Sequence, residues 1–367
     1  MRPDPVIIPL SDWANARLAE LAAHSPTAAL KALSGRELLA MRARLNRFAV
    51  PARTSAGGGC RFYPTHDGWL ALNLARADDT ALLPALVGRD VPDLADPAVL
   101  ARVLGERPTA DLLQQGRTLG LAIAALDETP VSPALALAAP GQAARPRSGP
   151  PVVIDLSALW AGPLAAQLLH RSGARVIKVE SRSRPDAMRE GDPLLFAFLN
   201  EGKESVALDL REAAGRDALL AMIRKADVVI EAARPRALAQ LGIDAAALVD
   251  ATPGLAWVTI TGHGICGEAA GWTGFGDDAA VAGGLSRALF EATGAIGFVG
   301  DAIADPLTGI LAAQTAAGML HEGTGGRVIL SMSGVVALAL QQSRAADADG
   351  LHRQLADWSS AVGQPIS

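Results

Sequence analysis

One stretch, residues 152–180, constrains the fold more than any other part of the chain. It opens with the apolar run 152–154, passes through a small-residue turn at 160–163 into an apolar-rich segment, and closes with the β-branched run 175–180. This pattern predicts a strand, a helix and a second strand. Such a unit builds a parallel sheet with a right-handed crossover, and open sheets of this kind bind ligands at the carboxyl ends of their strands. We therefore expect a site at the turn 160–163.

The same alternation continues to about residue 331. Apolar runs predict further strands, and segments rich in alanine and leucine predict helices between them. The expected fold class is α/β, with a Rossmann-like doubly wound parallel sheet plus a smaller α+β domain. The predicted strands are 205–210, 227–231, 256–261 and 327–331, and the predicted helices are 213–225 and 306–320.

A proline-, alanine- and glycine-rich stretch upstream of residue 152 is typical of a linker. We therefore predict a small α+β domain over 1–135, a linker over 136–151 and the Rossmann-like domain over 152–367. The small domain has helical patterns capped by Ser11 and Ser34 and again over 79–129. Between them lie the triglycine Gly57, Gly58 and Gly59 and a hairpin pattern around 66–68, while the chain after about residue 340 carries little predictive pattern.

Composition excludes several classes of protein. The chain has 367 residues, half of them hydrophobic, and a net charge of −5, which gives no footprint for nucleic acid. Cys60 and Cys266 lie far apart and match no zinc spacing, so we expect reduced thiols and no metal. No uncharged run reaches the roughly 20 residues needed to cross a bilayer, and the N-terminus does not resemble a signal peptide. We expect a cytoplasmic protein without a membrane partner.

The segment Gly262–Gly267 satisfies the G-x-G-x-x-G pattern of dinucleotide-binding proteins. A true fingerprint opens directly into a helix, whereas the continuation here, 268–274, is too rich in glycine for one. We therefore predict a turn after a strand rather than an NAD site. The scattered histidines likewise give little support for a hydrolase triad.

Several motifs in order resemble the class III CoA-transferase family, which includes formyl-CoA and carnitine-CoA transferases and α-methylacyl-CoA racemases. The resemblance covers roughly residues 152–337. It is carried by the motifs at 155–163, 173–180, 200–210, 226–231, 234–235, 241–242, 260–264 and 304–309, and by the glycine turn 323–326. The triglycine and the Asp67–Leu72 strand resemble the family's small domain, which follows the nucleophile in typical members but comes first here.

The resemblance implies a site and a reaction. Asp305 matches the nucleophilic aspartate, and the triglycine Gly57, Gly58 and Gly59 matches a catalytic loop that closes over it. Coenzyme A or acyl-CoA is implied as a substrate rather than a tightly bound cofactor, a carboxylic acid as the other substrate, and a homodimer as the assembly. The implied CoA contacts are Trp160, Ala161, Leu208, Asp209, Arg211, Arg234 and Asp277.

Alternatives remain open on the residues alone. Asp305 precedes a proline, as helix-capping aspartates often do, and Asp301 is a rival nucleophile. The family resemblance implies that a racemase would use a His-Asp pair in the segment 275–278. Phe275 stands where the histidine would be, which argues against a racemase. Ser181 replaces an arginine common in the family, which motivates a third possibility, a catalytically silent CoA-binding subunit.

Overall fold

The computed structural model describes residues 6–25, 27–144, 146, 148–233 and 235–366. Within this part of the chain, a seven-stranded sheet organises the molecule, in the order β4-β10-β9-β8-β5-β6-β7. All neighbouring pairs are parallel except β10 with β4. The strands are β4 (Leu135–Ala143), β5 (Val152–Asp155), β6 (Arg175–Ser181), β7 (Glu204–Leu208), β8 (Val228–Glu231), β9 (Ala256–Thr261) and β10 (Thr324–Ser331).

The strand order is that of a doubly wound, Rossmann-like sheet, as predicted. Starting at β5, the chain runs outward through β6 and β7, then returns to place β8, β9 and β10 on the other side of β5. The order therefore reverses between β5 and β8, which is where a doubly wound sheet opens a crevice for a ligand. Residues 160–163 follow β5 directly, so the predicted ligand turn lies at this switch point.

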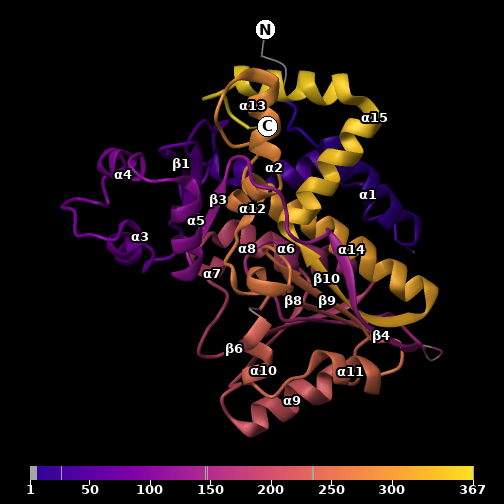
Figure 1. Ribbon diagram of the computed structural model, residues 1–367. Coiled ribbons are helices and arrows are strands. Elements are labelled where there is room, and N and C mark those ends of the chain that lie inside the picture. The colour runs from indigo at the N-terminus through magenta and orange to yellow at the C-terminus, as the bar shows by residue number, and fades with distance from the viewer. Residues whose placement is uncertain (1–5, 26, 145, 147, 234, 367) are drawn as a thin grey trace.

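Helices cover both faces of the sheet, as Figure 1 shows. Residues alternate between the faces along β5: Val153 packs in the core with α6 and α14, and Ile154 packs in the core with α9 and α11. The fold class predicted from the sequence is thus confirmed. The helices of this part of the chain are α6 (Ala161–Arg171), α7 (Met188–Gly191), α8 (Pro193–Asn200), α9 (Ala213–Ile223), α10 (Pro235–Gln240), α11 (Ala245–Ala251), α12 (Gly276–Ala282), α13 (Leu285–Thr293) and α14 (Ala304–Glu322).

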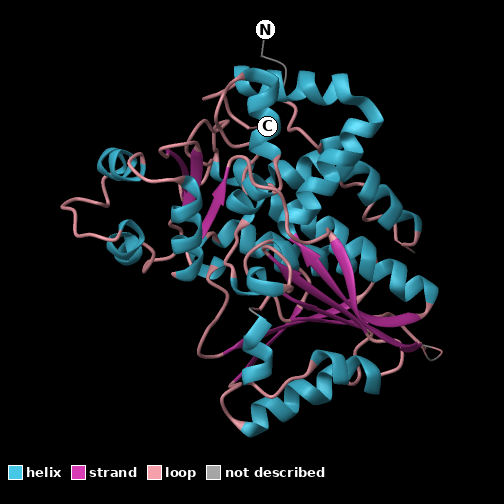
Figure 2. Cartoon of the chain, viewed as in Figure 1, coloured by secondary structure: helices cyan, strands magenta, loops and turns pink. Residues whose placement is uncertain are grey.

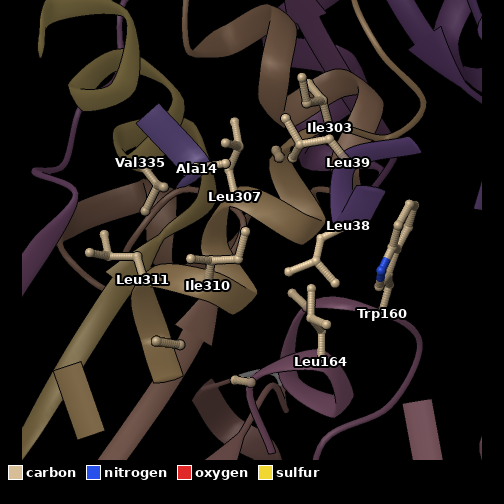
Figure 3. Close-up of a cluster of buried hydrophobic side chains, with 14 of the residues drawn as sticks. Ala14, Leu38, Leu39, Trp160, Leu164, Ile303, Leu307, Ile310, Leu311 and Val335 are labelled. Carbon is tan, nitrogen blue, oxygen red and sulfur yellow. The ribbon is translucent and has the colours of Figure 1, made fainter. Parts of the chain in front are cut away.

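Two N-terminal helices, α1 (Ser11–Ala23) and α2 (Gly35–Asn46), join the larger core. Ser34 caps α2 as predicted, in a reciprocal capping box with Glu37. Figure 3 shows Leu38 and Leu39 beside side chains of α6 and α14. Although these helices lie within the predicted small domain, they bury their apolar side chains with the large sheet. The domain boundaries themselves remain a prediction.

The remaining N-terminal residues form a separate small sheet, visible beside the large one in Figure 2. The predicted hairpin around 66–68 joins its first two strands. Its third strand lies within 79–129, where only helical patterns were expected. The elements are β1 (Cys60–Pro64), β2 (Trp69–Asn73), η1 (Thr80–Leu82), α3 (Leu83–Val87), α4 (Pro97–Leu104), α5 (Thr109–Thr118) and β3 (Ala122–Ala125).

Strand β4 occupies much of the segment predicted as a linker. It pairs antiparallel with β10 at the edge of the sheet, with register shifts between Thr324 and Gly326 and between Arg327 and Val328. An edge position tolerates Pro140, because the missing N–H need not pair with a further strand. The proline-, alanine- and glycine-rich composition of this segment argues against a helix or a central strand, but it is compatible with the edge strand β4.

The C-terminal part forms the long helix α15 (Met332–Ser360), which kinks at Asp347. Beyond it the chain returns to the segment that follows α2. Val50 donates its N–H to the Gln364 carbonyl at 2.8 Å, and Ile366 donates to the Phe48 carbonyl at 3.1 Å. This terminal pairing joins two segments more than 300 residues apart in the sequence, so the first helices and the last turn form one unit.

Candidate active site

The turn after β5 is the first part of the candidate site. Trp160 and Ala161 stand at the start of α6, and the Trp160 ring is 2% exposed. The indole Nε1 of Trp160 has no hydrogen-bond partner among the described residues. Leu159 before it adopts a left-handed φ of 67°, and its N–H donates to the Asp186 carboxylate at 3.1 Å. The turn is thus held in a conformation that its sequence alone disfavours.

A buried network of charged side chains contacts the backbone of this turn and the residues just before it. Lys203 Nζ lies 2.8 Å from Asp155 Oδ2, and Lys178 Nζ lies 3.0 Å from Asp186 Oδ2. All four side chains are at most 2% exposed. Lys178 also donates to the Ser157 carbonyl at 3.0 Å. Because buried charges are costly unless paired, each lysine and aspartate here depends on its partner.

We expect Lys203→Ala to destabilise the fold by about 3–5 kcal/mol, because it leaves Asp155 as a buried charge without its closest cation. The matched control is Arg175→Ala. The Arg175–Glu204 pair is half exposed and is expected to contribute at most about 1 kcal/mol. Urea denaturation of both variants measures the difference, and equal losses of stability would contradict the expectation.

The other predicted CoA contacts lie along the same edge of the sheet. Leu208 ends β7, and the exposed Arg211 pairs with Asp209 at 3.3 Å just beyond it. Strand β6 separates this group from the turn after β5. Arg234, also predicted as a contact, lies outside the described residues. The structure therefore places Leu208, Asp209 and Arg211 on the predicted edge but not against Trp160.

Asp305 lies in the first turn of α14 and is partly exposed. The N-cap of this helix is Ile303 and makes no side-chain capping bond, so Asp305 does not cap the helix in the way its Asp-Pro sequence suggests. Its carboxylate instead interacts with the backbone N–H of Ala161 at the start of α6. Two segments far apart in the sequence therefore meet at this carboxylate.

Two glycines allow this close meeting. A β-carbon at Gly309, one turn after Asp305, would lie 2.7 Å from the Ala161 carbonyl oxygen. A β-carbon at Gly276 would lie 2.2 Å from Asp305 Oδ2 itself. The four-residue spacing from Asp305 to Gly309 thus has a packing reason, because it lets α14 approach the start of α6.

Arg42 of α2 supplies positive charge to this region. Its Nε and Nη2 atoms contact the Asp301 carboxylate at 2.9 and 2.5 Å, and Asp301 is 1% exposed. The guanidinium carbon lies 5.5 Å from the Trp160 ring centroid and 5.7 Å from that of Phe48. Asp301 is therefore engaged as an ion-pair partner, which separates it from the partly exposed Asp305.

The predicted contact Asp277 lies near Asp305 rather than at the end of β7. It accepts a 2.9 Å hydrogen bond from the backbone N–H of Ala302, which adopts a left-handed φ of 43°. Burial and the Asp301 charge raise the pKa of Asp277 to about 6, against the effect of Arg42. Removal from water and the Asp277 charge likewise raise the pKa of Asp305 to about 7, again opposed by Arg42. We refer to Asp277, Asp301 and Asp305 as the carboxylate cluster.

Asp278, next to the cluster, is fully buried and accepts hydrogen bonds from the Asn73 side chain and from the backbone N–H of Phe275. Burial raises its pKa to about 8. Below the ordinary value of 3.8 the folded and unfolded states are both protonated at this position. As the pH rises toward 8, only the unfolded state ionises, so this group's contribution to folding stability is progressively lost.

We therefore expect Asp278→Asn to gain stability relative to the wild type as the pH rises from 5 to 8. The relative gain is on the order of 1 kcal/mol per pH unit, because asparagine does not ionise in either state. Thermal denaturation at several pH values measures it, with the exposed Asp349→Asn as control. A difference between Asp278→Asn and the wild type that stays constant with pH would contradict the assigned protonation.

The triglycine forms a tight turn rather than an open loop. Across it, the Ser55 N–H donates to the Cys60 carbonyl at 2.8 Å and the Cys60 N–H donates to Ser55 Oγ at 3.1 Å. Gly58 has a φ of 77°, which suits glycine. A β-carbon at Gly57 would lie 2.7 Å from Arg42 Nη2. The turn therefore lies against the cation that contacts Asp301, and Gly59 lies at its far end, near Asn73.

The G-x-G-x-x-G segment follows β9 as a loop and a short 3₁₀ turn, η2 (Gly267–Gly271), with no α-helix opening from it. This agrees with the predicted turn after a strand. Within the described residues, no group of three or more histidine, cysteine, aspartate or glutamate side chains is placed to hold a metal ion. No described helix has the length and apolarity required to span a membrane.

Comparison with known proteins gives a family. The model of "CoA-transferase family III" matches residues 151–359, which is more than half of the chain. The chain belongs to CoA-transferase family III. The matched segment contains Trp160, Asp277 and Asp305. The triglycine and Arg42 precede it.

Individual relatives match over shorter stretches. Acetyl-CoA:oxalate CoA-transferase of Acetobacter aceti is 37% identical, over 32% of each chain. Succinyl-CoA--D-citramalate CoA-transferase of Chloroflexus aurantiacus is 33% identical, over 46% of this chain and 44% of its own. The matches thus span less than half of these relatives' length. A solved structure, the hypothetical protein Rv3272 of Mycobacterium tuberculosis, is 28% identical with a TM-score of 0.48, over 56% of this chain and 61% of that one.

Proposed function

We propose that this family III protein is a CoA-transferase that moves CoA from an acyl-CoA donor to a carboxylic acid acceptor. The observation that carries the proposal is the position of Asp305. Asp305 is a partly exposed residue, and its carboxylate lies where the start of α14 meets the turn at the sheet's switch point. A carboxylate in that position can meet a thioester bound across the strand ends.

In the proposed reaction, an Asp305 oxygen attacks the thioester carbonyl carbon, the carbon–sulfur bond breaks, and CoA leaves as a thiolate with the electron pair. The thiolate then attacks the Asp305 carbonyl of the resulting anhydride, which gives aspartyl-CoA and releases the donor's carboxylate. The acceptor carboxylate repeats these two steps in reverse order. The products are a new acyl-CoA and the original Asp305 carboxylate, so neither protons nor electrons are gained or lost.

The residues predicted to contact CoA support this proposal in different ways. The Nε1 of Trp160, which has no hydrogen-bond partner in the part of the chain that the structure describes, is a donor that a ligand oxygen can use. Arg211 and the edge at Leu208 and Asp209 offer a cation for a phosphate, and Arg234 is retained as a proposed contact. The triglycine at Gly57, Gly58 and Gly59 is proposed to shield the anhydride from water. CoA enters as a substrate and no tightly bound cofactor is proposed.

The test combines exchange and trapping. The protein is incubated with acetyl-CoA or succinyl-CoA and with oxalate or citramalate, the reactants in the names of its relatives, and new acyl-CoA is measured by chromatography. Hydroxylamine added during turnover, followed by peptide mass spectrometry, should leave a hydroxamate at Asp305. Exchange without modification at Asp305 would contradict the proposed intermediate.

Two other outcomes would favour the alternatives. Deuterium uptake at the substrate α-carbon without an acceptor acid would favour the racemase, against which Phe275 argues. CoA binding with no reaction across the acid panel would favour a silent subunit. We also propose a homodimer in the cytoplasm, a location favoured by the two widely spaced cysteines, which do not form a disulfide framework.

A further inference from the structure

Arg42 contacts several parts of the candidate site, although it lies more than 100 residues before the segment that matches the family. Its guanidinium meets Asp301, faces the Trp160 ring and touches the triglycine at Gly57. The carboxylate that Arg42 contacts directly, Asp301, is four residues before Asp305. This geometry gives α2 a place in the site that the family match alone does not assign.

We propose that Arg42 is the positioning residue of this site, and that its guanidinium fixes the 301–305 turn and favours the ionised, nucleophilic form of Asp305. This inference rests on the proposed function for its link to catalysis, but the effect on Asp305 is independent of the reaction. A carboxylate must be ionised to attack a thioester, and three neighbouring carboxylates without a cation would favour protonation.

The contacts of Arg42 explain why it is held in place. Nε and Nη2 bind Asp301 in a two-point contact, which fixes the plane of the guanidinium. Phe48 and Trp160 lie within 6 Å of it, so aromatic rings add to the restraint. Any side chain at Gly57 would displace it, because a β-carbon there would lie 2.7 Å from Nη2. Arg42 is therefore restrained on several sides.

The charged groups around Asp305 come from several elements. Asp277 of α12 and Asp301 of the preceding turn disfavour the ionised form, whereas Arg42 of α2 and the Ala161 N–H favour it. Further out, Asp278 and Cys60 face Asp277, and Asp192 faces Asp301. Removing Arg42 or Asp301 should therefore move the Asp305 titration in opposite directions, which a purely structural contribution would not do.

The experiment titrates the Asp305 carboxyl carbon by NMR in full-length protein labelled with ¹³C-aspartate, with Asp305→Asn used to assign the signal. Arg42→Gln is expected to raise the Asp305 pKa by about one to three units. Asp301→Asn is expected to lower it. Arg42→Lys should give a smaller rise than Arg42→Gln, because the charge is kept but the two-point contact is lost. Arg44→Gln on the exposed side of α2 is the matched control and should leave the titration unchanged.

Arg42→Gln leaves Asp301 buried without its cation and can unfold the protein, so the double variant Arg42→Gln/Asp301→Asn provides a neutral, hydrogen-bonding replacement. In the double variant the Asp305 pKa should fall between the values of the two single variants. An unchanged Asp305 titration in both the double variant and Asp301→Asn would overturn the inference, as would a rise in Asp301→Asn.

Activity separates this inference from the proposed function. If the wild type exchanges CoA, the pH at which its kcat/KM reaches half of the maximum should move with the NMR titration in each variant. If the wild type shows no exchange, the proposed function fails, while the titration still decides whether Arg42 sets the ionisation of Asp305. A kcat/KM profile that stays fixed while the NMR titration moves would overturn the catalytic part of the inference.

Discussion

Replacing Asp305 with asparagine is expected to lower CoA exchange by about three orders of magnitude or more while the protein stays folded. Asparagine has nearly the same shape as aspartate, but its amide oxygen cannot form the anhydride. Chromatography of acyl-CoA products measures the loss, and thermal denaturation verifies folding. Because burial raises the pKa of Asp305 to about 7, wild-type exchange should also fall as the pH drops through 7, where the carboxylate becomes protonated.

The control for this substitution is Asp349→Asn, which makes the same chemical change at an exposed position of α15. It should retain wild-type exchange. Exchange in Asp305→Asn comparable to that of the control would mean that another group forms the covalent intermediate. Asp301 would then be tested next, although its two-point contact with Arg42 argues against that role.

Gly276→Ala is expected to reduce both activity and stability. Its β-carbon would lie 2.2 Å from Asp305 Oδ2 and 2.3 Å from the Ala302 carbonyl oxygen, so the backbone or the carboxylate must move. Overpacking of this kind costs about 1–3 kcal/mol. A displacement of about 1 Å at the nucleophile can lower exchange on the order of 100-fold. Urea denaturation and steady-state kinetics measure the two effects.

Gly318→Ala provides the comparison, since Gly318 lies in α14 with Asp305 and a β-carbon there would meet nothing within 4 Å. Alanine is a better helix former, so this variant should be more stable by about 0.5–1 kcal/mol and fully active. If Gly276→Ala behaved in the same way, the close packing of Gly276 on Asp305 would be refuted.

The sheet could be predicted from the sequence because its signals are local. Strand β9 spans 256–261, as its apolar and β-branched residues predict, and the turn after β5 lies at the switch point as expected. Apolar runs and the glycine and proline residues that end them act within a few residues, so they can be interpreted without the fold.

The contribution of Arg42 could not be predicted in this way. It is 259 residues from Asp301 in the sequence, and nothing around it on α2 distinguishes it from the neighbouring arginines. Only the packing of α2 against α14 brings the two side chains together. A contact between distant residues leaves no periodic signal in a single sequence, which is why the sequence indicated the proposed nucleophile, Asp305, but did not indicate Arg42.

The C-terminal helix was missed for a different reason. The second half of α15 is largely exposed and polar, and a kink at Asp347 separates it from the first half. Leu351, Leu355 and Trp358 are nevertheless buried at helical spacing. That pattern is a usable signal for an amphipathic helix, which the alanine-rich composition of the tail obscured.

The terminal pairing links the last residues of the chain to the chemistry of the site. Ile366 bonds to Phe48, and Phe48 lies on the guanidinium of Arg42. Detachment of the last few residues should therefore loosen the support of Arg42 without disturbing the sheet. In hydrogen-exchange measurements, the amides at 363–366 and 48–50 are expected to open together, in an event of lower free energy than global unfolding. Reactivity at Asp305 would then depend on the equilibrium between the attached and detached tail, about 60 residues further along the chain.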